Sequence, residues 1–148
     1  MISQKAKYAL RALVALARLE RGAAMTIGEI AEAQSIPKKF LEQILLELKR
    51  ARIVESKRGK SGGYGLFRPA EMISFGEVLR LIDGPIAPLP CLSKVAYRRC
   101  ADCGDESGCE IRRVFARVAE SSRAVLDGTM IADAIDLAKG PAGQAIQP

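Results

Sequence analysis

The chain has 148 residues, a net charge of +6 and neither histidine nor tryptophan. The absence of histidine removes the usual general base and the usual imidazole metal ligand, which argues against an enzyme. The charge is uneven, because residues 1–68 hold 14 Lys/Arg and 6 Asp/Glu, whereas residues 69–148 hold 9 and 11. Since no apolar stretch is long enough to span a membrane, we expect a cytoplasmic protein whose basic N-terminal half binds an anionic polymer.

The first segment has the pattern of an amphipathic helix. Residues 3–20 place apolar side chains three and four positions apart, and Gly22 ends the pattern. Thr26 and Glu29 then form a Thr-x-x-Glu capping box, in which each side chain accepts a hydrogen bond from the backbone of the other residue. A second, short helix is therefore expected after residue 26.

A third helix is expected after a tight turn at residues 34–36. Pro37 suits the first turn of a helix, and the helical spacing continues to about Arg50. The residues expected to face the core are Phe40, Leu41, Ile44, Leu45 and Leu48. Two short helices joined by a tight turn predict a helix-turn-helix.

A basic hairpin is expected next. Residues 53–57 and 64–67 have strand character and enclose the glycine-rich turn 58–63. Glycine permits positive φ and a close approach of backbone to a phosphate group. A basic hairpin that directly follows a helix-turn-helix is typical of the wing of a winged-helix domain.

The second half begins with a short helix and a long loop. Ser74 and Glu77 form another capping box, and the helix that follows is expected to end near residue 84. Residues 85–109 contain three prolines and the four cysteines and show little periodicity. We interpret them as an irregular loop.

A long amphipathic helix is expected from Glu110 to Gly128, with Thr129 capping a last short helix. Its apolar stripe consists of Ile111, Val114, Phe115, Val118, Ser122 and Val125. Such a stripe commonly packs on the core of its own chain. Here it lies beyond a module that already has a core, which favours a partner helix and hence a homodimer on a palindromic operator.

The expected fold is mainly α with a small β-hairpin wing, that is, a winged helix-turn-helix plus a long dimerisation helix. We divide the chain into a DNA-binding domain at 1–84, a cysteine-containing loop at 85–109, the dimerisation and C-terminal helices at 110–138, and a flexible tail at 139–148.

The residues expected to contact DNA lie at the start of the third helix and in the hairpin. They are Lys38, Lys39, Glu42 and Gln43 in the helix and Lys57, Arg58 and Lys60 in the hairpin. Gln can pair with adenine, Glu can accept from cytosine, and Lys suits phosphate or guanine. An arginine in a wing suits a narrow A·T minor groove. These charges could also be an ordinary solvated surface, but the hairpin that follows the helix favours DNA contact.

The four cysteines read Cys-x8-Cys-x2-Cys-x5-Cys: Cys91, Cys100, Cys103 and Cys109. In a reducing cytosol this pattern is more typical of metal binding or redox chemistry than of disulfides. Burial as free thiols is a poor explanation, since their neighbours are Arg, Asp, Gly and Lys. On spacing alone, an iron–sulfur cluster and a closed four-cysteine zinc site both remain open.

Three segments resemble the IscR, NsrR and RirA family of bacterial winged-helix regulators. They are residues 37–45 (PKKFLEQIL), 58–66 (RGKSGGYGL) and 126–133 (LDGTMIAD), and the resemblance extends from residue 1 to about residue 135. It implies a homodimer with a long dimerisation helix, and an arginine of the wing, here Arg58, in the minor groove. Many members also hold an iron–sulfur cluster just before that helix.

The resemblance also implies a ligand set. Cys91, Cys103 and Cys109 match the three cysteines that hold the cluster in the family, although the gap from Cys91 to Cys103 is longer. Where IscR-type proteins have a ligating histidine, three residues after the last cysteine, this chain has Arg112. The additional Cys100 is the best candidate for the fourth ligand. The weaker candidates are Asp102, Asp105 and Glu106.

We therefore predict a DNA-binding transcriptional regulator that is not an enzyme. It would sense iron, redox state or nitric oxide through a two-iron or four-iron cluster in the loop between Cys91 and Cys109. The alternative is a zinc-stabilised DNA-binding or scaffold protein without a sensing cluster.

Overall fold

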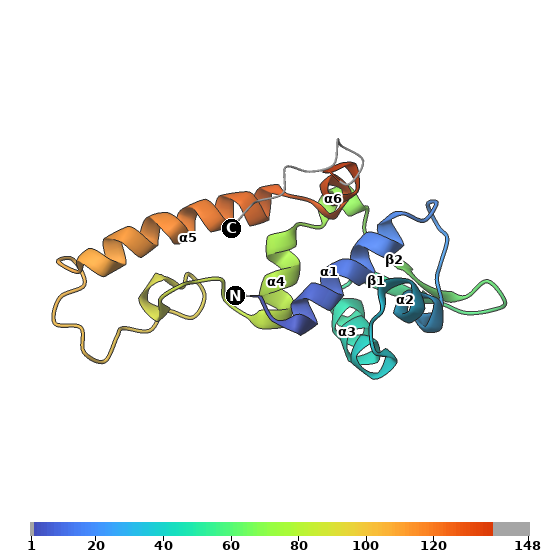
Figure 1. Ribbon diagram of the computed structural model, residues 1–148, viewed down its shortest axis with the longest axis horizontal. Helices are drawn as coiled ribbons and strands as arrows, with labels where there is room; N and C mark the ends of the chain where they lie inside the picture. The colour runs from blue at the N-terminus through green and yellow to red at the C-terminus, as the bar shows by residue number, and fades with distance from the viewer. Residues whose placement is uncertain (1, 138–148) are drawn as a thin grey trace.

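The computed structural model describes residues 2–137, so the expected tail at 139–148 lies outside the described residues. Within them the fold is mainly helical with a two-stranded antiparallel sheet, as predicted (Figure 1). The elements in chain order are α1 (Gln4–Ala17), α2 (Ile27–Gln34), α3 (Lys38–Arg50), β1 (Val54–Lys57), β2 (Gly63–Leu66), η1 (Ala70–Met72), α4 (Phe75–Asp83), η2 (Pro90–Leu92), α5 (Glu110–Gly128) and α6 (Ile131–Leu137). None of these helices is long and apolar enough to cross a membrane.

Side-chain caps define where the first two helices begin. At α1, the Ser3 hydroxyl accepts a hydrogen bond from the N–H of Ala6 at 3.0 Å. At α2 the predicted capping box is present, with Thr26 accepting from the Glu29 N–H at 3.2 Å and Glu29 accepting from the Thr26 N–H at 2.7 Å. These bonds satisfy backbone donors that a helix leaves free. The bonds from the Thr26 backbone N–H and hydroxyl to the Glu29 carboxylate also hold the pKa of Glu29 below its usual value.

The core lies where α1 meets α2, α3, α4 and α6. Small side chains cover the buried face of α1 and let the neighbouring helices approach its backbone. The fully buried ones are Ala6, Ala9 and Ala12. The third helix contributes Leu41, Ile44, Leu45 and Leu48, all with no exposed surface. From the far end of the chain, α6 adds the fully buried Ile131, so the C-terminal helix packs into the same body as the helix-turn-helix.

The hairpin pairs Val54 with Leu66 at one end and Lys57 with Gly63 at the other. It is fixed to the body by Met25, whose backbone exchanges two hydrogen bonds with Tyr64, at 2.9 and 2.7 Å. The contact is so close that a Cβ on Gly63 would lie 2.3 Å from the Met25 carbonyl oxygen. The glycine-rich motif therefore serves packing as well as the positive φ that was expected, which Gly63 adopts at +141°.

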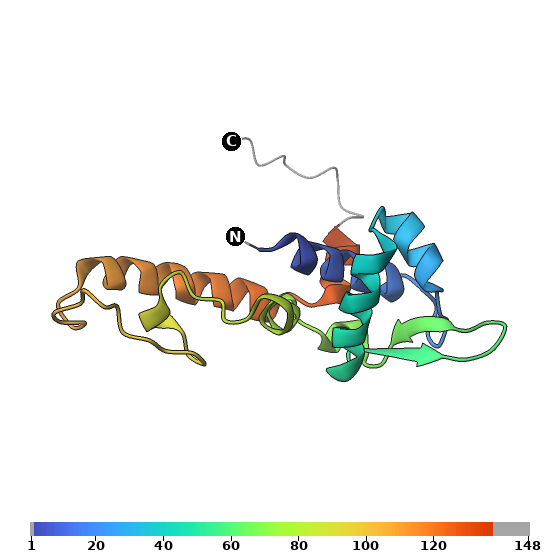
Figure 2. The ribbon, with the colours of Figure 1, turned by 90° about the horizontal axis from the view of Figure 1, so that it is seen from below.

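The 19-residue α5 extends away from this body, and both views of the ribbon agree on its direction (Figures 1 and 2). Its C-terminal end is fixed by backbone hydrogen bonds, from the Phe75 N–H to the Thr129 carbonyl at 2.9 Å and from the Ile131 N–H to the Ile73 carbonyl at 2.8 Å. Its N-terminal end follows the cysteine loop, residues 85–109. The long helix is thus attached to the body at one end.

One expected core residue of α3 is exposed. Phe40 was predicted to face inward, but 54 % of its surface is accessible. Its ring packs edge-to-face on Tyr8 of α1, with centroids 6.3 Å apart and planes at 74°. Phe40 lies at the margin of the buried stripe, where α1 covers only one side of the ring.

The capping box expected before α4 is only half formed. The Ser74 hydroxyl accepts from the Glu77 N–H at 3.1 Å, as a cap does. The Glu77 carboxylate, however, binds Arg68 instead of the Ser74 backbone. A competing cation thus replaces the second half of the box.

The expected cap of the last helix is also different. The Thr129 hydroxyl donates to the Val125 carbonyl at 2.7 Å and so closes the end of α5. At the start of α6 the Met130 N–H donates to the Asp133 carboxylate at 2.7 Å. Thr129 therefore belongs to the preceding helix, because its hydroxyl finds a free carbonyl there.

Candidate nucleic-acid interface and cysteine loop

The outer face of α3 carries the four helix residues expected to contact DNA. Because the apolar side chains of α3 turn into the core, Lys38, Lys39, Glu42 and Gln43 are exposed on the opposite side. Within residues 2–137 none of the four forms an ion pair. Their polar groups can therefore contact bases or phosphates without breaking a salt bridge.

The same face continues beyond the set predicted from the sequence. Leu46 lies one turn after Glu42 and Gln43 and is 41 % exposed. An apolar side chain on such a helix can contact the methyl group of thymine. Arg50 is exposed one turn further on. The signal for both was in the sequence, since they follow Gln43 at helical spacing.

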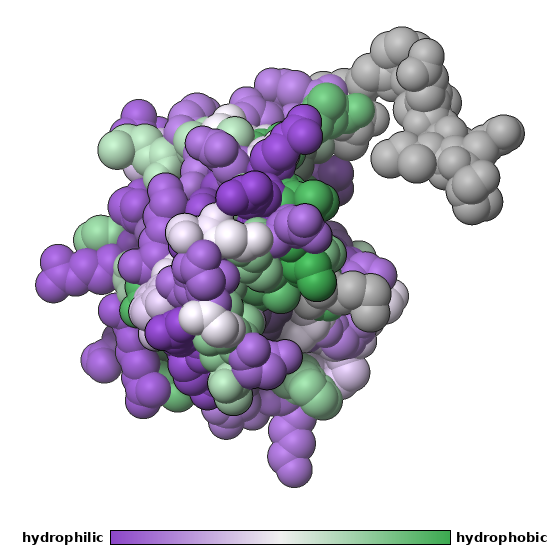
Figure 3. All heavy atoms as spheres, turned by 90° about the vertical axis from the view of Figure 1, so that its left-hand side faces the viewer, coloured by the Kyte–Doolittle hydropathy of each residue, from purple (hydrophilic) through white to green (hydrophobic). Residues whose placement is uncertain are grey.

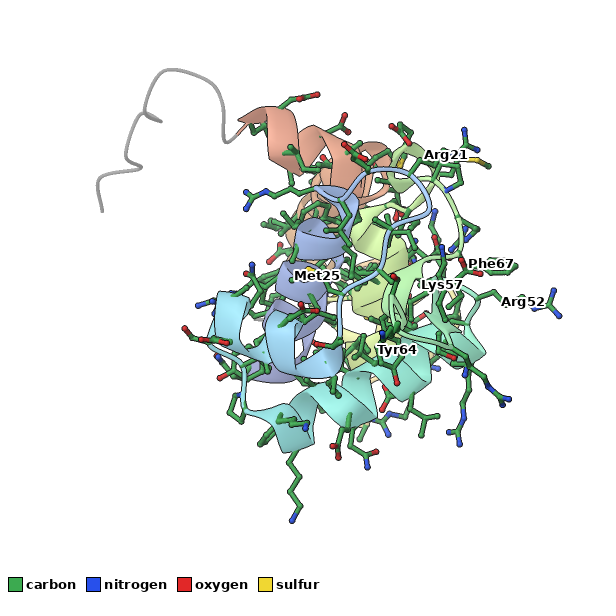
Figure 4. The ribbon with its side chains drawn as sticks, turned by 90° about the vertical axis from the view of Figure 1, so that its right-hand side faces the viewer. Arg21, Met25, Arg52, Lys57, Tyr64 and Phe67 are labelled. Atoms are coloured by element: carbon green, nitrogen blue, oxygen red, sulfur yellow. The ribbon has the colours of Figure 1, made fainter. Side chains whose placement is uncertain are left out.

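The turn from α3 into the hairpin adds a further arginine. Arg52 has φ of 55°, in the left-handed region, and its exposed side chain points away from the body (Figure 4). Lys49 at the end of α3 donates to the Ser56 hydroxyl on β1 at 2.6 Å, which ties the helix to the hairpin. Arg52 was missed because a left-handed residue other than glycine or asparagine has little sequence signal.

The three basic residues of the hairpin have different surroundings. Arg58 and Lys60 are exposed in the turn between the strands. Lys57 points back to the body, where its ammonium group donates to the Gly22 carbonyl at 2.5 Å and lies 3.6 Å from the Glu55 carboxylate (Figure 4). Arg58 and Lys60 are thus placed to contact a ligand directly, whereas Lys57 holds the hairpin in position.

Three of the four cysteines are neighbours. Cys91 in η2 is buried, and its thiol lies beside that of the half-buried Cys100. Partial burial raises the pKa of Cys100, and the neighbouring Cys91, Cys103 and Asp102 raise it further. A backbone turn, with the Cys103 N–H donating to the Cys100 carbonyl at 3.2 Å, keeps the last two together.

Cys109 lies at the start of α5 and caps it. Its sulfur accepts a hydrogen bond from the backbone N–H of Arg112, with 3.4 Å between Sγ and N. A helix N-terminus favours a negatively charged group. Among residues 2–137 the expected trio of Cys91, Cys103 and Cys109 is not brought together as a metal site, and the additional Cys100 is the cysteine that lies beside Cys91.

Two acidic candidates for the fourth ligand are occupied in turns of the loop. The Asp105 carboxylate accepts from the N–H groups of Ser107 and Gly108, at 2.9 Å each, and the bonds to Ser107 in particular lower its pKa. Glu106 accepts from the Tyr97 hydroxyl at 2.7 Å, and this bond raises the pKa of Tyr97. These bonds make both carboxylates weaker ligand candidates than the thiols.

The residue types of the loop fit a metal centre held by sulfur. Besides the four thiols, the Nε of Arg112 is buried and has no hydrogen-bond partner among the described residues. A cationic donor without an acceptor suits an anionic group. Across residues 2–137, however, no three Cys, Asp or Glu side chains are arranged to hold a metal ion. The match of the loop to a metal centre therefore depends on its residue types, the four thiols and the unpaired Arg112 Nε.

The outer face of α5 is apolar and exposed. Ile111, Val114, Val118 and Val125 are 62, 61, 47 and 66 % exposed, and Ala119 is the buried residue of this helix. A groove of about 390 Å³ lies between α5, α4 and the start of the cysteine loop. Figure 3 looks onto the free end of α5 and the cysteine loop and shows apolar side chains among polar ones.

The helix-turn-helix, the wing and the basic outer face of α3 together define a winged-helix DNA-binding protein. A family model described as "Rrf2: Iron-dependent Transcriptional regulator" matches residues 2–137. The chain belongs to the Rrf2 family. This confirms the expected relationship to the family that includes IscR.

Similar proteins agree with this assignment. The chain is 49 % identical over 150 residues to an rrf2-like HTH-type transcriptional regulator of Rhodobacter capsulatus, covering 99 % of both chains. CymR of Bacillus subtilis, the global cysteine regulator, has a TM-score of 0.78 at 28 % identity, over 93 % of this chain and 97 % of that one. T. potens IscR has a TM-score of 0.74 at 26 % identity, and the match covers 100 % of this chain and 93 % of that one. The relatives are transcriptional regulators, which confirms that the chain is not an enzyme.

Proposed function

We propose that this member of the Rrf2 family is a cytoplasmic, homodimeric regulator whose affinity for a palindromic operator depends on an iron–sulfur cluster in the cysteine loop. The observation that supports this proposal most directly is that the Cys91 and Cys100 thiols lie side by side near Cys103, in a loop that ends with Cys109. The four thiolates are the proposed ligands. A bound cluster supplies a redox-active centre, and iron supply, redox state and nitric oxide are the candidate signals.

The surroundings of the loop support an anionic centre. Cys109 receives a backbone N–H at the start of α5, where the helix dipole favours negative charge. Arg99 and Arg113 bond to loop carbonyls, of Gly104 at 2.8 Å and of Ser107 at 2.9 Å, and so bring positive charge to the loop. These cations offset the charge of clustered thiolates, which would otherwise repel one another.

The apolar face of α5 supports the homodimer. The core of the winged-helix body is complete without this face, which leaves a row of large apolar side chains in water. Val118 also lines the groove beside α5, together with Leu79, Ile86 and Leu126. A second copy presents the same apolar row, as a two-fold interface requires. The partner's α5 is therefore the proposed occupant of this face.

The attachment of α5 supplies a route from the loop to the DNA. At its fixed end, Asp127 forms an ion pair with Arg80 of α4 at 2.6 Å, and α4 packs against α1. A change near Cys109 that tilts or shifts α5 alters how two copies pack. It thereby alters the spacing of the two α3 helices. This spacing must match the fixed distance between the two half-sites of a palindromic operator.

The test begins with protein purified without oxygen. Iron, acid-labile sulfide and zinc are measured, and affinity is measured for a duplex selected by the protein from a random library. We expect iron and sulfide in equal amounts, and an affinity that changes when the cluster is removed. Zinc without sulfide would favour the alternative of a zinc-stabilised protein without a sensing role. A cluster whose loss leaves affinity unchanged would exclude the regulatory part of the proposal.

Single Cys→Ala variants test the ligand set. Loss of the visible absorption is expected for Cys91→Ala, Cys103→Ala and Cys109→Ala, and Cys100→Ala is expected to lose it as well. If Cys100→Ala alone retains the full spectrum, the trio implied by the family stands and the fourth ligand lies elsewhere. A full cluster in all four variants would rule out this site.

A further inference from the structure

Arg112 has a buried donor that no described residue satisfies. Its Nε has almost no accessible surface and, among residues 2–137, no hydrogen-bond partner, although the residue as a whole is half-buried. A buried N–H group without an acceptor loses its bond to water and gains none in return. Such a donor calls for an acceptor that the described residues do not provide.

The side chain of Arg112 lies against the cysteine loop. Its backbone N–H already bonds to the sulfur of Cys109, so the residue starts one turn from that thiol. Its positive charge acts on Tyr97, where it opposes the rise in pKa caused by Glu106. The guanidinium group therefore lies near Tyr97 of the loop, and its backbone is bonded to the sulfur of Cys109.

Neighbouring arginines differ from Arg112 in having acceptors. Arg99 donates to the carbonyls of Cys103 and Gly104, at 3.0 and 2.8 Å. Arg113, the next residue along α5, is exposed and donates to the Ser107 carbonyl at 2.9 Å. Both hold the loop in shape through backbone oxygens. The free Nε is thus particular to Arg112 and does not follow from a general excess of arginine.

We infer that Arg112 donates its Nε–H to a metal-bound sulfur of the cysteine loop; this rests on the proposed cluster. Thiolate and sulfide sulfurs are acceptors, and an arginine is always cationic, so it can donate to the centre but does not compete for the metal. Hydrogen bonds and positive charge near the sulfurs stabilise the reduced, more negative state and raise the reduction potential. Arg112 is thus a positioning and tuning residue, at the place where IscR-type proteins have a ligating histidine.

The inference is tested on protein reconstituted without oxygen, with Arg112→Ala, Arg112→Lys and the matched control Arg113→Ala. The midpoint potential is measured by titration followed in the visible spectrum, and the rate of cluster loss is measured in excess chelator. Arg112→Ala should shift the potential to more negative values and lose the cluster roughly 10- to 100-fold faster, as when a hydrogen-bond partner of a metal ligand is removed. Arg112→Lys, which keeps the charge, should recover part of the shift. Arg113→Ala, which removes a loop cation that bonds to a backbone carbonyl, should shift the potential and the loss rate by less than Arg112→Ala.

Three outcomes would overturn the inference. A wild-type potential and loss rate in Arg112→Ala would remove the residue from the centre. Equal shifts in Arg112→Ala and Arg113→Ala would show that net charge alone matters. A wild-type protein without iron and sulfide would overturn the proposed cluster as well. If circular dichroism shows that Arg112→Ala is unfolded, Arg112→Met, which keeps much of the side-chain length without a charge or an N–H donor, replaces it under the same criteria.

Discussion

Replacing Gly63 by alanine should detach the wing from the body. A Cβ at this position would lie 2.3 Å from the Met25 carbonyl oxygen and 2.8 Å from the Thr26 nitrogen. Both are backbone atoms, which cannot rotate away as the end of a side chain does. The strand must therefore move, and the two hydrogen bonds between Met25 and Tyr64 are lost with it.

The size of the effect follows from these contacts. Two backbone hydrogen bonds contribute about 0.5–1.5 kcal/mol each, and alanine at the φ of Gly63, +141°, adds about 1–3 kcal/mol of strain. The free energy of unfolding should fall by about 2–6 kcal/mol in total. The matched control is Gly59→Ala, where φ is +104° and an added Cβ meets nothing within 4 Å. It should cost only the strain, about 1–3 kcal/mol.

The assay is urea unfolding followed by circular dichroism, at one protein concentration because a dimer's stability depends on it. DNA affinity measured on the folded fraction should fall more for Gly63→Ala than for Gly59→Ala, since only the former moves the whole hairpin. Equal losses of stability in the two variants would refute the steric argument. The wing would then be held by something other than its contact with Met25.

Three further predictions concern DNA and assembly. DNA affinity should fall steeply between low and moderate salt, because contacts to phosphates release counterions; an affinity that is flat with salt would contradict the basic interface. Arg58→Ala should weaken operator binding by about 1–3 kcal/mol with the fold intact, whereas wild-type affinity in a gel-shift titration would remove Arg58 from the interface. Val118→Asp should convert a dimer to a monomer in sedimentation, because the charge would be buried unpaired; a wild-type monomer at micromolar concentration would refute the dimer itself.

The DNA-binding half could be predicted because its signals are local. Thr26 and Glu29 form their capping box three residues apart, and the buried stripe of α3 repeats at helical spacing. Phe40 was misplaced because spacing gives the direction of a side chain and says nothing of how far the neighbouring helix extends over it. Lys57 was assigned to DNA on its charge, which stays a prediction, and its bond to the Gly22 carbonyl, 35 residues away, had no local signal.

The cysteine loop was less predictable, since its arrangement depends on contacts without a periodic pattern. Cys100 and Cys103 are only three residues apart in the sequence, and a backbone turn joins them. That Cys91 meets Cys100, and that Cys109 caps α5, depends on where η2 and α5 lie in space. The buried Nε of Arg112 had no sequence signal, because burial of a single atom is decided by its surroundings.

The one-sided attachment of α5 has an evolutionary consequence. Its 19 residues span about 28 Å, so Cys109 at its free end is remote from the bonds that fix Thr129 and Ile131 to the body. Of the loop, only Ile86 packs against the hydrophobic core. Its sequence can therefore diverge with little loss of stability in the DNA-binding body. The same frame recurs in the two similar structures named for a global cysteine regulator and for IscR.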